Sequence, residues 1–174
     1  VDFETLYLIY FKRREFKMVT IDIPGKGKMK IENVVLDFNG TIAHDGTLKD
    51  GIKEKIEKLN EMEIKVYILT ADTYNQAKKQ CEGLPVTLEI FDGENAALSK
   101  REIVNKIDSD VTMTIGNGNN DVEMFEESAL SVAVIGDEGC AVKAIFSADI
   151  ITKDINDAID LILNPQRIKA TLRM

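Results

Sequence analysis

Short hydrophobic runs alternate with longer amphipathic segments over most of the chain. The runs that we expect to form strands cover residues 34–38, 64–69, 86–91, 111–115, 130–135 and, more weakly, 149–152. Between and after them lie the segments expected to form helices, at residues 51–62, 73–81, 95–107, 121–127, 139–146 and 155–163. In the first of these segments Ile52, Ile56 and Leu59 recur at helical spacing, which predicts one buried stripe.

The strand runs are hydrophobic at successive positions, so both faces of the sheet should be covered. Strands that alternate with helices predict an α/β fold with a three-layer, Rossmann-like parallel sheet. Upstream of it, residues 19–23 alternate in polarity, a turn follows at residues 24–27, and residues 29–32 alternate again, which predicts an N-terminal β-hairpin. The pattern contains no linker or repeat, and we expect residues 18–174 to form a single domain.

Residues 1–17 differ from the rest of the chain. Five of its eleven Phe and Tyr residues fall between Phe3 and Phe16, beside a basic cluster at residues 12–14. This segment is either an arm that docks on a partner or a membrane surface, or an extension upstream of the true start of the protein. We favour the extension, because the regular pattern opens directly at Met18.

The composition is that of a soluble globular protein, with 44% hydrophobic and 30% charged residues. The excess of 30 acidic over 22 basic residues argues against binding to duplex nucleic acid or to an anionic membrane surface. The hydrophobic run at residues 6–11 is too short to span a bilayer. Cys81 and Cys140 lie far apart without metal-ligand spacing, and we interpret both as small buried residues in a reducing compartment. The resulting expectation is a cytoplasmic protein.

Polar residues follow the carboxyl ends of the expected strands, which is where ligands bind in parallel sheets. The first strand leads into Asp37-Phe38-Asn39-Gly40-Thr41, the second into Thr70-Ala71-Asp72, and the fourth into the glycine- and asparagine-rich residues 116–121. Lys100 lies in the helix before the fourth strand. Taken singly, these residues are typical of helix caps, turns and a solvated helix lysine.

In their order along the chain, the same fragments resemble the four motifs of the haloacid dehalogenase superfamily, over residues 34–151. The Thr70-Ala71-Asp72 step and residues 116–121 are similar to the phosphorylation domain of P-type ATPases. The turn at residues 23–27 and the segment 163–173 are similar to small soluble P-type ATPase-like proteins. A response-regulator receiver would also offer Asp, Thr and Lys, but it lacks the Gly-Thr step and the final Asn-Asp pair.

The chemistry of these residue types and the resemblance imply the same roles. Asp37 would attack phosphorus, while Thr70 and Lys100 would hold the oxygens of the transferred phosphoryl group. The expected catalytic residues are Asp37, Asn39, Thr70 and Lys100. The expected phosphate-binding residues are Thr70, Ala71, Lys100, Gly40 and Asn120. The expected cofactor is Mg²⁺, with the ligands Asp37, Asn39 (through its backbone carbonyl), Asn117 and Asp121.

Residues 38–69 and 71–99 leave no room for a cap domain once their strands and helices are counted. We therefore expect a capless fold with an open site. The sole histidine, His44, falls in the short flap segment after Thr41, and we interpret it as a solvated loop residue rather than as a substitute acid/base.

Two positions depart from the phosphatase pattern. Asn39 stands where phosphatases carry an acid/base Asp, and Asn117 stands where they carry a metal-binding Asp. Because a carboxamide cannot carry a proton, we expect a Mg²⁺-dependent phosphatase or phosphotransferase whose aspartyl-phosphate intermediate hydrolyses slowly. The alternative is a catalytically weak phosphate-binding or regulatory module on the same fold. The expected partner is a small phosphorylated substrate or a protein, and the sequence leaves assembly into a homo-oligomer open.

Overall fold

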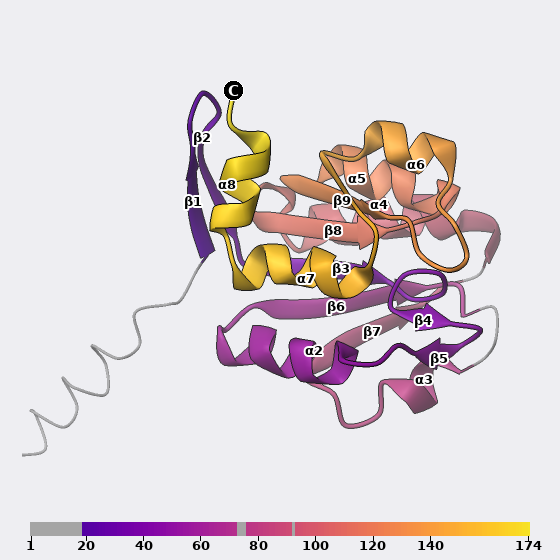
Figure 1. Ribbon diagram of the computed structural model, residues 1–174. Helices are drawn as coiled ribbons and strands as arrows, with labels where there is room; N and C mark the ends of the chain where they lie inside the picture. Colours follow the sequence, from indigo (N-terminus) through magenta and orange to yellow (C-terminus); the bar gives the residue numbers. More distant parts are fainter. Residues whose placement is uncertain (1–18, 73–75, 92) are drawn as a thin grey trace, which may run out of the picture.

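A six-stranded parallel sheet forms the centre of the molecule (Figure 1). The computed structural model describes residues 19–72, 76–91 and 93–174. The strand order is β10-β9-β8-β3-β6-β7. The strands are β3 (Asn33–Asp37), β6 (Lys65–Thr70), β7 (Val86–Ile90), β8 (Thr112–Gly116), β9 (Leu130–Val134) and β10 (Ile150–Thr152). Each begins and ends within one residue of the run predicted for it, because a strand covered on both faces is hydrophobic along its whole length.

Helices cover both faces of this sheet and confirm the three-layer α/β fold (Figure 1). The hydrophobic cluster on one face includes α2 (Ile52–Glu61), α7 (Ile155–Leu163) and α8 (Gln166–Leu172). The cluster on the other face includes α4 (Ala96–Lys106), α5 (Val122–Glu127) and α6 (Val142–Ser147). The stripe predicted for residues 51–62 is present, since Ile52, Ile56 and Leu59 are all buried in the first cluster.

The predicted N-terminal hairpin is also confirmed. β1 (Val19–Ile23) pairs antiparallel with β2 (Gly27–Ile31), and the two form a separate sheet. Its buried face includes Val19, Ile21 and Ile23, and β1 packs against α8. The sequence pattern did not predict α8, because the last helix that it predicted ends at residue 163 and no hydrophobic pattern was recognised after it. Pro165 precedes the first turn of α8 with φ −60°, where a proline is well tolerated.

Four other expectations have different outcomes. Helix α6 begins at Val142 rather than at residue 139, because residues 136–141 form an irregular loop that contains a tight turn. For the helix predicted at 73–81, the structure shows α3 (Ala77–Gln80), and residues 73–75 lie outside the described ranges. Residues 1–17 lie outside them as well, so the proposal that they are an extension stays a prediction. Cys81 is buried as expected, whereas Cys140 is only partly buried on the irregular loop.

The sheet topology brings the predicted site residues to one edge. From β3 the chain proceeds to β6 and β7 on one side and later to β8, β9 and β10 on the other, so β3 lies at the switch point where parallel sheets bind ligands. Asp37, the last residue of β3, pairs with Leu69 of β6, while Leu36 pairs with Ile115 of β8. Residues that follow these three strands therefore meet at the carboxyl edge of the sheet.

Only small elements lie beside this edge, which agrees with the capless fold. Residues 38–64 form the two-stranded β4 (Ala43–His44) and β5 (Thr47–Leu48) and then helix α2. The described part of residues 71–99 contains α3, β7, a 3₁₀ turn (Gly93–Asn95) and the start of α4. In the described ranges, no helix combines the length and the hydrophobicity that crossing a membrane requires.

Candidate active site

The ammonium group of Lys100 lies between the carboxylates of Asp37 and Asp121. Its Nζ donates to Asp37 Oδ1 at 2.6 Å and to Asp121 Oδ1 at 2.6 Å. The side chains of Lys100 and Asp121 have no exposed surface, while that of Asp37 keeps 9%. The three residues come from β3, α4 and the turn after β8, so the fold assembles this centre from distant parts of the chain.

Helix α4 explains why a lysine is buried here. The buried positions of α4 are Ala96, Lys100 and Val104, which recur every four residues and so share one face. This face packs on the sheet and directs Lys100 towards the carboxyl edge. Asp121 ends a 3₁₀ turn (Asn119–Asp121) that follows β8 directly. A lysine that would look solvated in isolation is therefore part of the buried centre.

The electrostatics of the centre depend on this pairing. Burial raises the pKa of Asp37 from 3.8 to about 6, although Lys100 lowers it and Asp121 raises it further. Burial alone would lower the pKa of Lys100, but the carboxylates of Asp121 and Asp37 raise it above its usual range. Lys100 is thus a permanent cation that offsets part of the negative charge of the buried carboxylates.

The second oxygen of Asp121 is bound by the backbone. Asp121 Oδ2 accepts the amide hydrogen of Asn117 at 2.9 Å and that of Gly118 at 2.8 Å. A Cβ atom on Gly116 would lie 2.4 Å from the carboxyl group of Asp121, so only glycine leaves space for it. The turn after β8 therefore fixes both the position and the orientation of this carboxylate.

Asp37 is held in a similar way by the loop that follows it. The hydroxyl of Thr41 lies 3.2 Å from Asp37 Oδ2 and 3.2 Å from Asn117 Oδ1, and it donates towards both. Asn117 Nδ2 donates in turn to the carbonyl of Gly139 at 3.1 Å. Gly40 has φ +79°, and a Cβ on it would lie 2.4 Å from Asn117 Nδ2. Asn117 is therefore packed tightly between this loop and residue 139.

The sequence interpretation gave Thr41 no role, although the Gly-Thr step was noticed as part of the motif. The signal was present, because a threonine four residues after a strand-terminal aspartate is close enough to bond its carboxylate. What could not be inferred was that the same hydroxyl also reaches Asn117, a residue 76 positions later.

Thr70 ends β6 at the same edge, one residue beyond the Leu69 that pairs with Asp37. Its hydroxyl oxygen accepts the amide hydrogen of Asp72 at 2.9 Å, and Asp72 accepts the amides of residues 76 and 77. Thr70 is 2% exposed. The structure thus places Thr70 and Ala71 at the same edge as the centre, and the hydrogen bonds between described residues include none from Thr70 to Asp37.

The remaining predicted residues are Asn39 and Asn120. Asn39 Oδ1 is buried and accepts no hydrogen bond from the residues that the structure describes. Asn120 lies in the 3₁₀ turn, with its side-chain oxygen against Gly118. A buried carboxamide oxygen without a donor is costly, unless a cation or a ligand completes it.

The donor atoms at this centre fit a hard divalent cation. The carboxylates of Asp37 and Asp121, which meet at Lys100, are oxygen donors, the class that Mg²⁺ prefers. Asn39, whose backbone carbonyl is the predicted third ligand, follows Asp37 by two residues and has a buried side-chain oxygen without a donor among the described residues. The side-chain oxygen of Asn117 already accepts from Thr41, which limits its part as a ligand.

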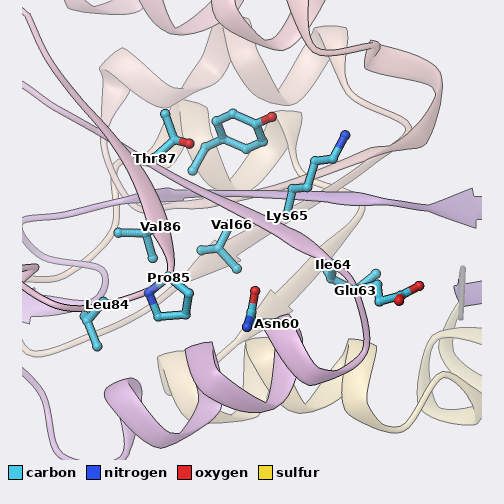
Figure 2. A pocket seen from close by; sticks show the side chains of 10 residues that line it. Asn60, Glu63, Ile64, Lys65, Val66, Leu84, Pro85, Val86 and Thr87 are labelled. Carbon is cyan, nitrogen blue, oxygen red and sulfur yellow. The ribbon is translucent and has the colours of Figure 1, made fainter. Parts of the chain in front are cut away.

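A cavity of about 550 Å³ lies elsewhere, beside the amino ends of β6 and β7 and the last turn of α2 (Figure 2). Its lining includes Lys65, Val66 and Val86, the first residues of the two strands. Asp37 lies at the carboxyl end of the neighbouring strand. The cavity is therefore at the opposite edge of the sheet from the candidate site.

Comparisons with known proteins agree with this geometry. Residues 96–159, which contain Lys100 and Asp121, match the haloacid dehalogenase-like hydrolase family. An uncharacterised protein of Methanocaldococcus jannaschii is 56% identical over 61 residues, which are 35% of this chain and 66% of that protein. A soluble P-type ATPase-like phosphatase of the same organism is 28% identical over 123 residues, which are 70% of this chain and 45% of that protein. The chain thus spans less than two thirds of either relative.

Among solved structures, the 3-deoxy-D-manno-octulosonate 8-phosphate phosphatase of Moraxella catarrhalis, in complex with magnesium ion, phosphate ion and KDO, has a similar fold. The TM-score is 0.65 at 16% identity, over 80% of this chain and 90% of that chain. This similarity concerns the fold alone. The family match at residues 96–159 and the similarity to the P-type ATPase-like relative point in the same direction, towards the haloacid dehalogenase-like hydrolases.

Proposed function

We propose that the protein is a Mg²⁺-dependent phosphatase or phosphotransferase that acts through an aspartyl phosphate on Asp37. The observation that carries this proposal is the buried ammonium of Lys100, which lies 2.6 Å from both Asp37 and Asp121 at the switch point of the sheet. A permanent cation there lets a carboxylate approach an anionic phosphoryl group, and it stabilises the charge that develops during transfer.

In the first step, a carboxylate oxygen of Asp37 attacks phosphorus, and the bond from phosphorus to the leaving oxygen breaks. The hydrogen bond from Thr41 fixes the rotation of the Asp37 carboxylate before attack. Lys100 stays beside the nucleophile, and Thr70 at the neighbouring strand end offers its hydroxyl to the phosphoryl oxygens. In the second step, water attacks phosphorus, inorganic phosphate leaves, and the Asp37 carboxylate is restored.

Three groups would hold Mg²⁺ in this mechanism: the carboxylates of Asp37 and Asp121 and the backbone carbonyl of Asn39. When bound, the ion would neutralise charge on the carboxylate and on the phosphoryl group. The pKa of about 6 for Asp37 belongs to the protein without a metal, and an adjacent divalent cation favours the ionised form that attacks.

Slow turnover is part of the proposal. The leaving oxygen and the attacking water both need proton transfer, and losing such a group typically costs about 10²–10⁴ in rate. Asn39 occupies the position expected for this group and cannot carry a proton. With an activated phosphate as the substrate, phosphorylation of Asp37 should therefore be faster than hydrolysis of the aspartyl phosphate. The phosphoenzyme should then accumulate.

Two of the comparisons support the reaction class. The relative that aligns over 70% of this chain is described as a soluble P-type ATPase-like phosphatase. The structural neighbour was solved with magnesium and phosphate ions, and its name describes it as a phosphatase of a small phosphorylated sugar acid. We accordingly propose a small phosphorylated compound as the substrate class.

Incubation with acetyl phosphate and Mg²⁺, followed by intact-mass measurement, tests this function. The wild type should gain one phosphoryl group that hydroxylamine removes, and Asp37→Asn should gain none. Asp22→Asn is the matched control, because it makes the same change at an exposed position of the N-terminal hairpin and should label like the wild type. Equal labelling of the wild type and Asp37→Asn would refute the assignment of the nucleophile.

The alternative is a phosphate-binding or regulatory module. The side chain of Asn117 favours this alternative, because both of its polar atoms already bond within the protein. Its oxygen accepts from Thr41, and its nitrogen donates to the carbonyl of Gly139. A site in which this residue serves packing rather than metal binding could keep its phosphate pocket without turnover. In that case calorimetry would detect binding of inorganic phosphate with Mg²⁺, while acetyl phosphate would leave the mass unchanged.

A further inference from the structure

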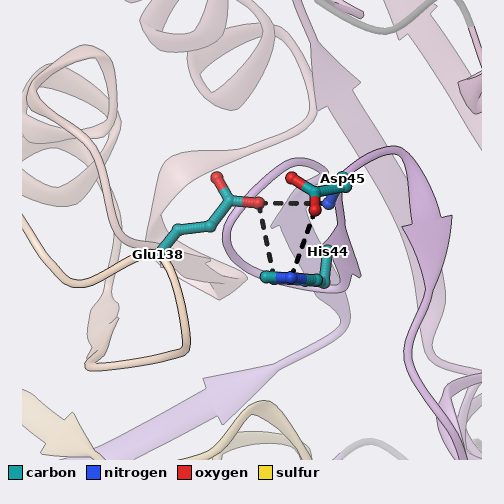
Figure 3. A group of neighbouring side chains, drawn as sticks. All are labelled: His44, Asp45 and Glu138. Atoms are coloured by element: carbon teal, nitrogen blue, oxygen red, sulfur yellow. Dashed lines mark hydrogen bonds and ion pairs between the residues drawn. The ribbon is translucent and has the colours of Figure 1, made fainter.

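Three side chains with metal-binding atoms meet on the surface beside the candidate active site (Figure 3). They are His44 at the end of β4, Asp45 in the turn after it, and Glu138 in the loop that precedes α6. His44 Nε2 lies 3.3 Å from Asp45 Oδ2, and His44 Nδ1 lies 3.9 Å from Glu138 Oε1. One ligand atom from each residue lies within 4.8 Å of the other two.

The packing of two loops holds this cluster together. The amide of Asp45 donates to Glu138 Oε1 at 3.3 Å, across 93 residues of sequence. Next to it, Lys49 Nζ lies 3.3 Å from Asp137 Oδ2 and ties the same two loops. The cluster therefore depends on the fold and not merely on neighbours in the sequence, and its geometry is present without a metal.

The residue types indicate which ion would fit. An imidazole with two carboxylates suits a borderline divalent transition metal such as Zn²⁺, whereas Mg²⁺ takes oxygen ligands alone. Tetrahedral zinc with bonds of about 2.0–2.1 Å sets its ligand atoms about 3.3 Å apart. A single zinc ion would take one ring nitrogen of His44. One ligand atom from each of the three residues lies within 4.8 Å of the other two, so the side chains would rotate inward to reach the tetrahedral spacing.

Charge and access also favour a cation. Asp45 and Glu138 supply two carboxylates to the cluster, while the nearby charges of Lys49 and Asp137 offset each other. The side chains of His44 and Asp45 are 49% and 69% exposed, so an ion reaches them from solvent. The cluster differs in kind from the Lys100 centre, which is buried and offers oxygen donors only.

We propose that His44, Asp45 and Glu138 form a second metal site that takes Zn²⁺ or a similar transition-metal ion. The bound ion would cross-link the β4–β5 hairpin to the loop at residues 136–141. The hairpin is bonded to the nucleophile loop through Gly40 N to Ala43 O at 2.9 Å, and the 136–141 loop is bonded to Asn117. Metal binding would thus stabilise the two segments beside the candidate active site, the β4–β5 hairpin and the loop at residues 136–141. This inference does not depend on the proposed function.

Calorimetric titration of the metal-free full chain with Zn²⁺, in saturating Mg²⁺, tests the proposal. We expect one equivalent to bind, and His44→Gln and Glu138→Gln should each weaken this binding at least about tenfold, the loss that even an outer-shell change can cause. The matched control is Asp137→Asn, which removes one charge from the same loop without removing a ligand, and it should bind Zn²⁺ within a few-fold of the wild type. Asp121→Asn should also keep the zinc site.

Two further measurements separate ligation from folding. The thermal midpoint of each variant in EDTA should match that of the wild type, because these side chains are exposed, and Zn²⁺ should raise the midpoint of the wild type but not of His44→Gln. With Co²⁺, a visible absorption band should appear in the wild type and disappear in His44→Gln. Zinc binding that persists in His44→Gln, or that is lost in Asp121→Asn instead, would overturn the proposal, as would the absence of any zinc binding.

Discussion

Lys100 Nζ and Asp121 Oδ1 lie 2.6 Å apart in a place where neither side chain has any exposed surface. An ion pair in such a place is stabilising only while both partners remain, because each charge lost its hydration on folding. Asp37 shares the same ammonium group. One cation thus serves two buried carboxylates, and the stability of the site depends on it.

Lys100→Met should therefore destabilise the metal-free protein by about 3–5 kcal/mol, the usual effect of removing one partner of a buried pair. Added Mg²⁺ should restore more stability to this variant than to the wild type, because it supplies the missing positive charge. Denaturant unfolding with EDTA and with Mg²⁺ measures both effects. Lys106→Met, an exposed position on the same helix, is the control and should change stability by less than about 0.5 kcal/mol. A cost below 1 kcal/mol for Lys100→Met would contradict the pairing.

Asp37→Asn should have the opposite effect on stability. Burial raises the pKa of Asp37 to about 6 from 3.8, so the folded protein binds the extra proton and loses stability as the pH rises between these values. Asparagine cannot ionise. In EDTA the variant should consequently be more stable than the wild type above pH 6, by up to about 3 kcal/mol, and equally stable below about pH 4.

Unfolding curves of Asp37→Asn between pH 4 and 7.5 would show this difference. The exposed Asp22→Asn is a suitable control, since it removes a carboxylate from the hairpin, far from Lys100 along the chain. A difference between Asp37→Asn and the wild type that does not vary with pH would show that Asp37 is not held at a raised pKa.

Asn39→Asp should accelerate hydrolysis of the phosphoenzyme by roughly 10-fold or more, because it is nearly isosteric and restores a proton carrier. The decay of the hydroxylamine-labile label, followed from pH 5 to 9 in saturating Mg²⁺, gives the rate. A new carboxylate near Asp37 raises the pKa of one of the pair, which makes the pH range necessary. Asn119→Asp, exposed in the turn after β8, adds the same charge as a control. If decay stays unchanged throughout the range, the lack of a proton carrier does not limit turnover.

Asn117→Asp should act on metal binding and on packing together. A further anionic ligand should lower the Mg²⁺ concentration for half-maximal labelling. The same change removes the hydrogen bond from Asn117 Nδ2 to Gly139 and turns a carboxylate towards that carbonyl, which should cost about 1–3 kcal/mol without metal. Magnesium titration and unfolding in EDTA test the two parts separately. An unchanged Mg²⁺ requirement together with lost stability would indicate that residue 117 serves packing alone.

The main sheet could be predicted almost to the residue because its strands are hydrophobic on both faces and end at polar residues. The helix α8 could not, because a proline is compatible both with a helix end and with a helix start, and only the hairpin that packs on α8 decides between them. The irregular loop before α6 was assigned to a helix because its sequence does not show the contacts with distant residues that determine its backbone. Its backbone is fixed by contacts such as the bond from the Ala141 amide to the Asn117 carbonyl.

At the site, the strand-end positions of Asp37 and Thr70, and that of Asp121 shortly after β8, followed from the parallel-sheet pattern. Lys100 taken alone was interpreted as a solvated helix lysine, and only the order of the motifs gave it a role at the site. The structure buries it on the helix face that it shares with Ala96 and Val104. The contacts that fix geometry were not accessible, because the hydroxyl of Thr41 and the carboxamide of Asn117 meet only after both strands are in place. Nor could the sequence show that His44 lies beside Glu138, since no periodicity links the two loops.

The packing of β1 against α8 has a consequence for the order of folding. The hairpin forms by local contacts, yet its hydrophobic face is completed by a helix that lies more than a hundred residues later in the chain. Closing so long a loop is entropically unfavourable until the intervening sheet has drawn the two segments together. The parallel sheet should therefore form first and the hairpin should dock last, so that the edge with the candidate site is assembled before the two ends of the described fold are joined.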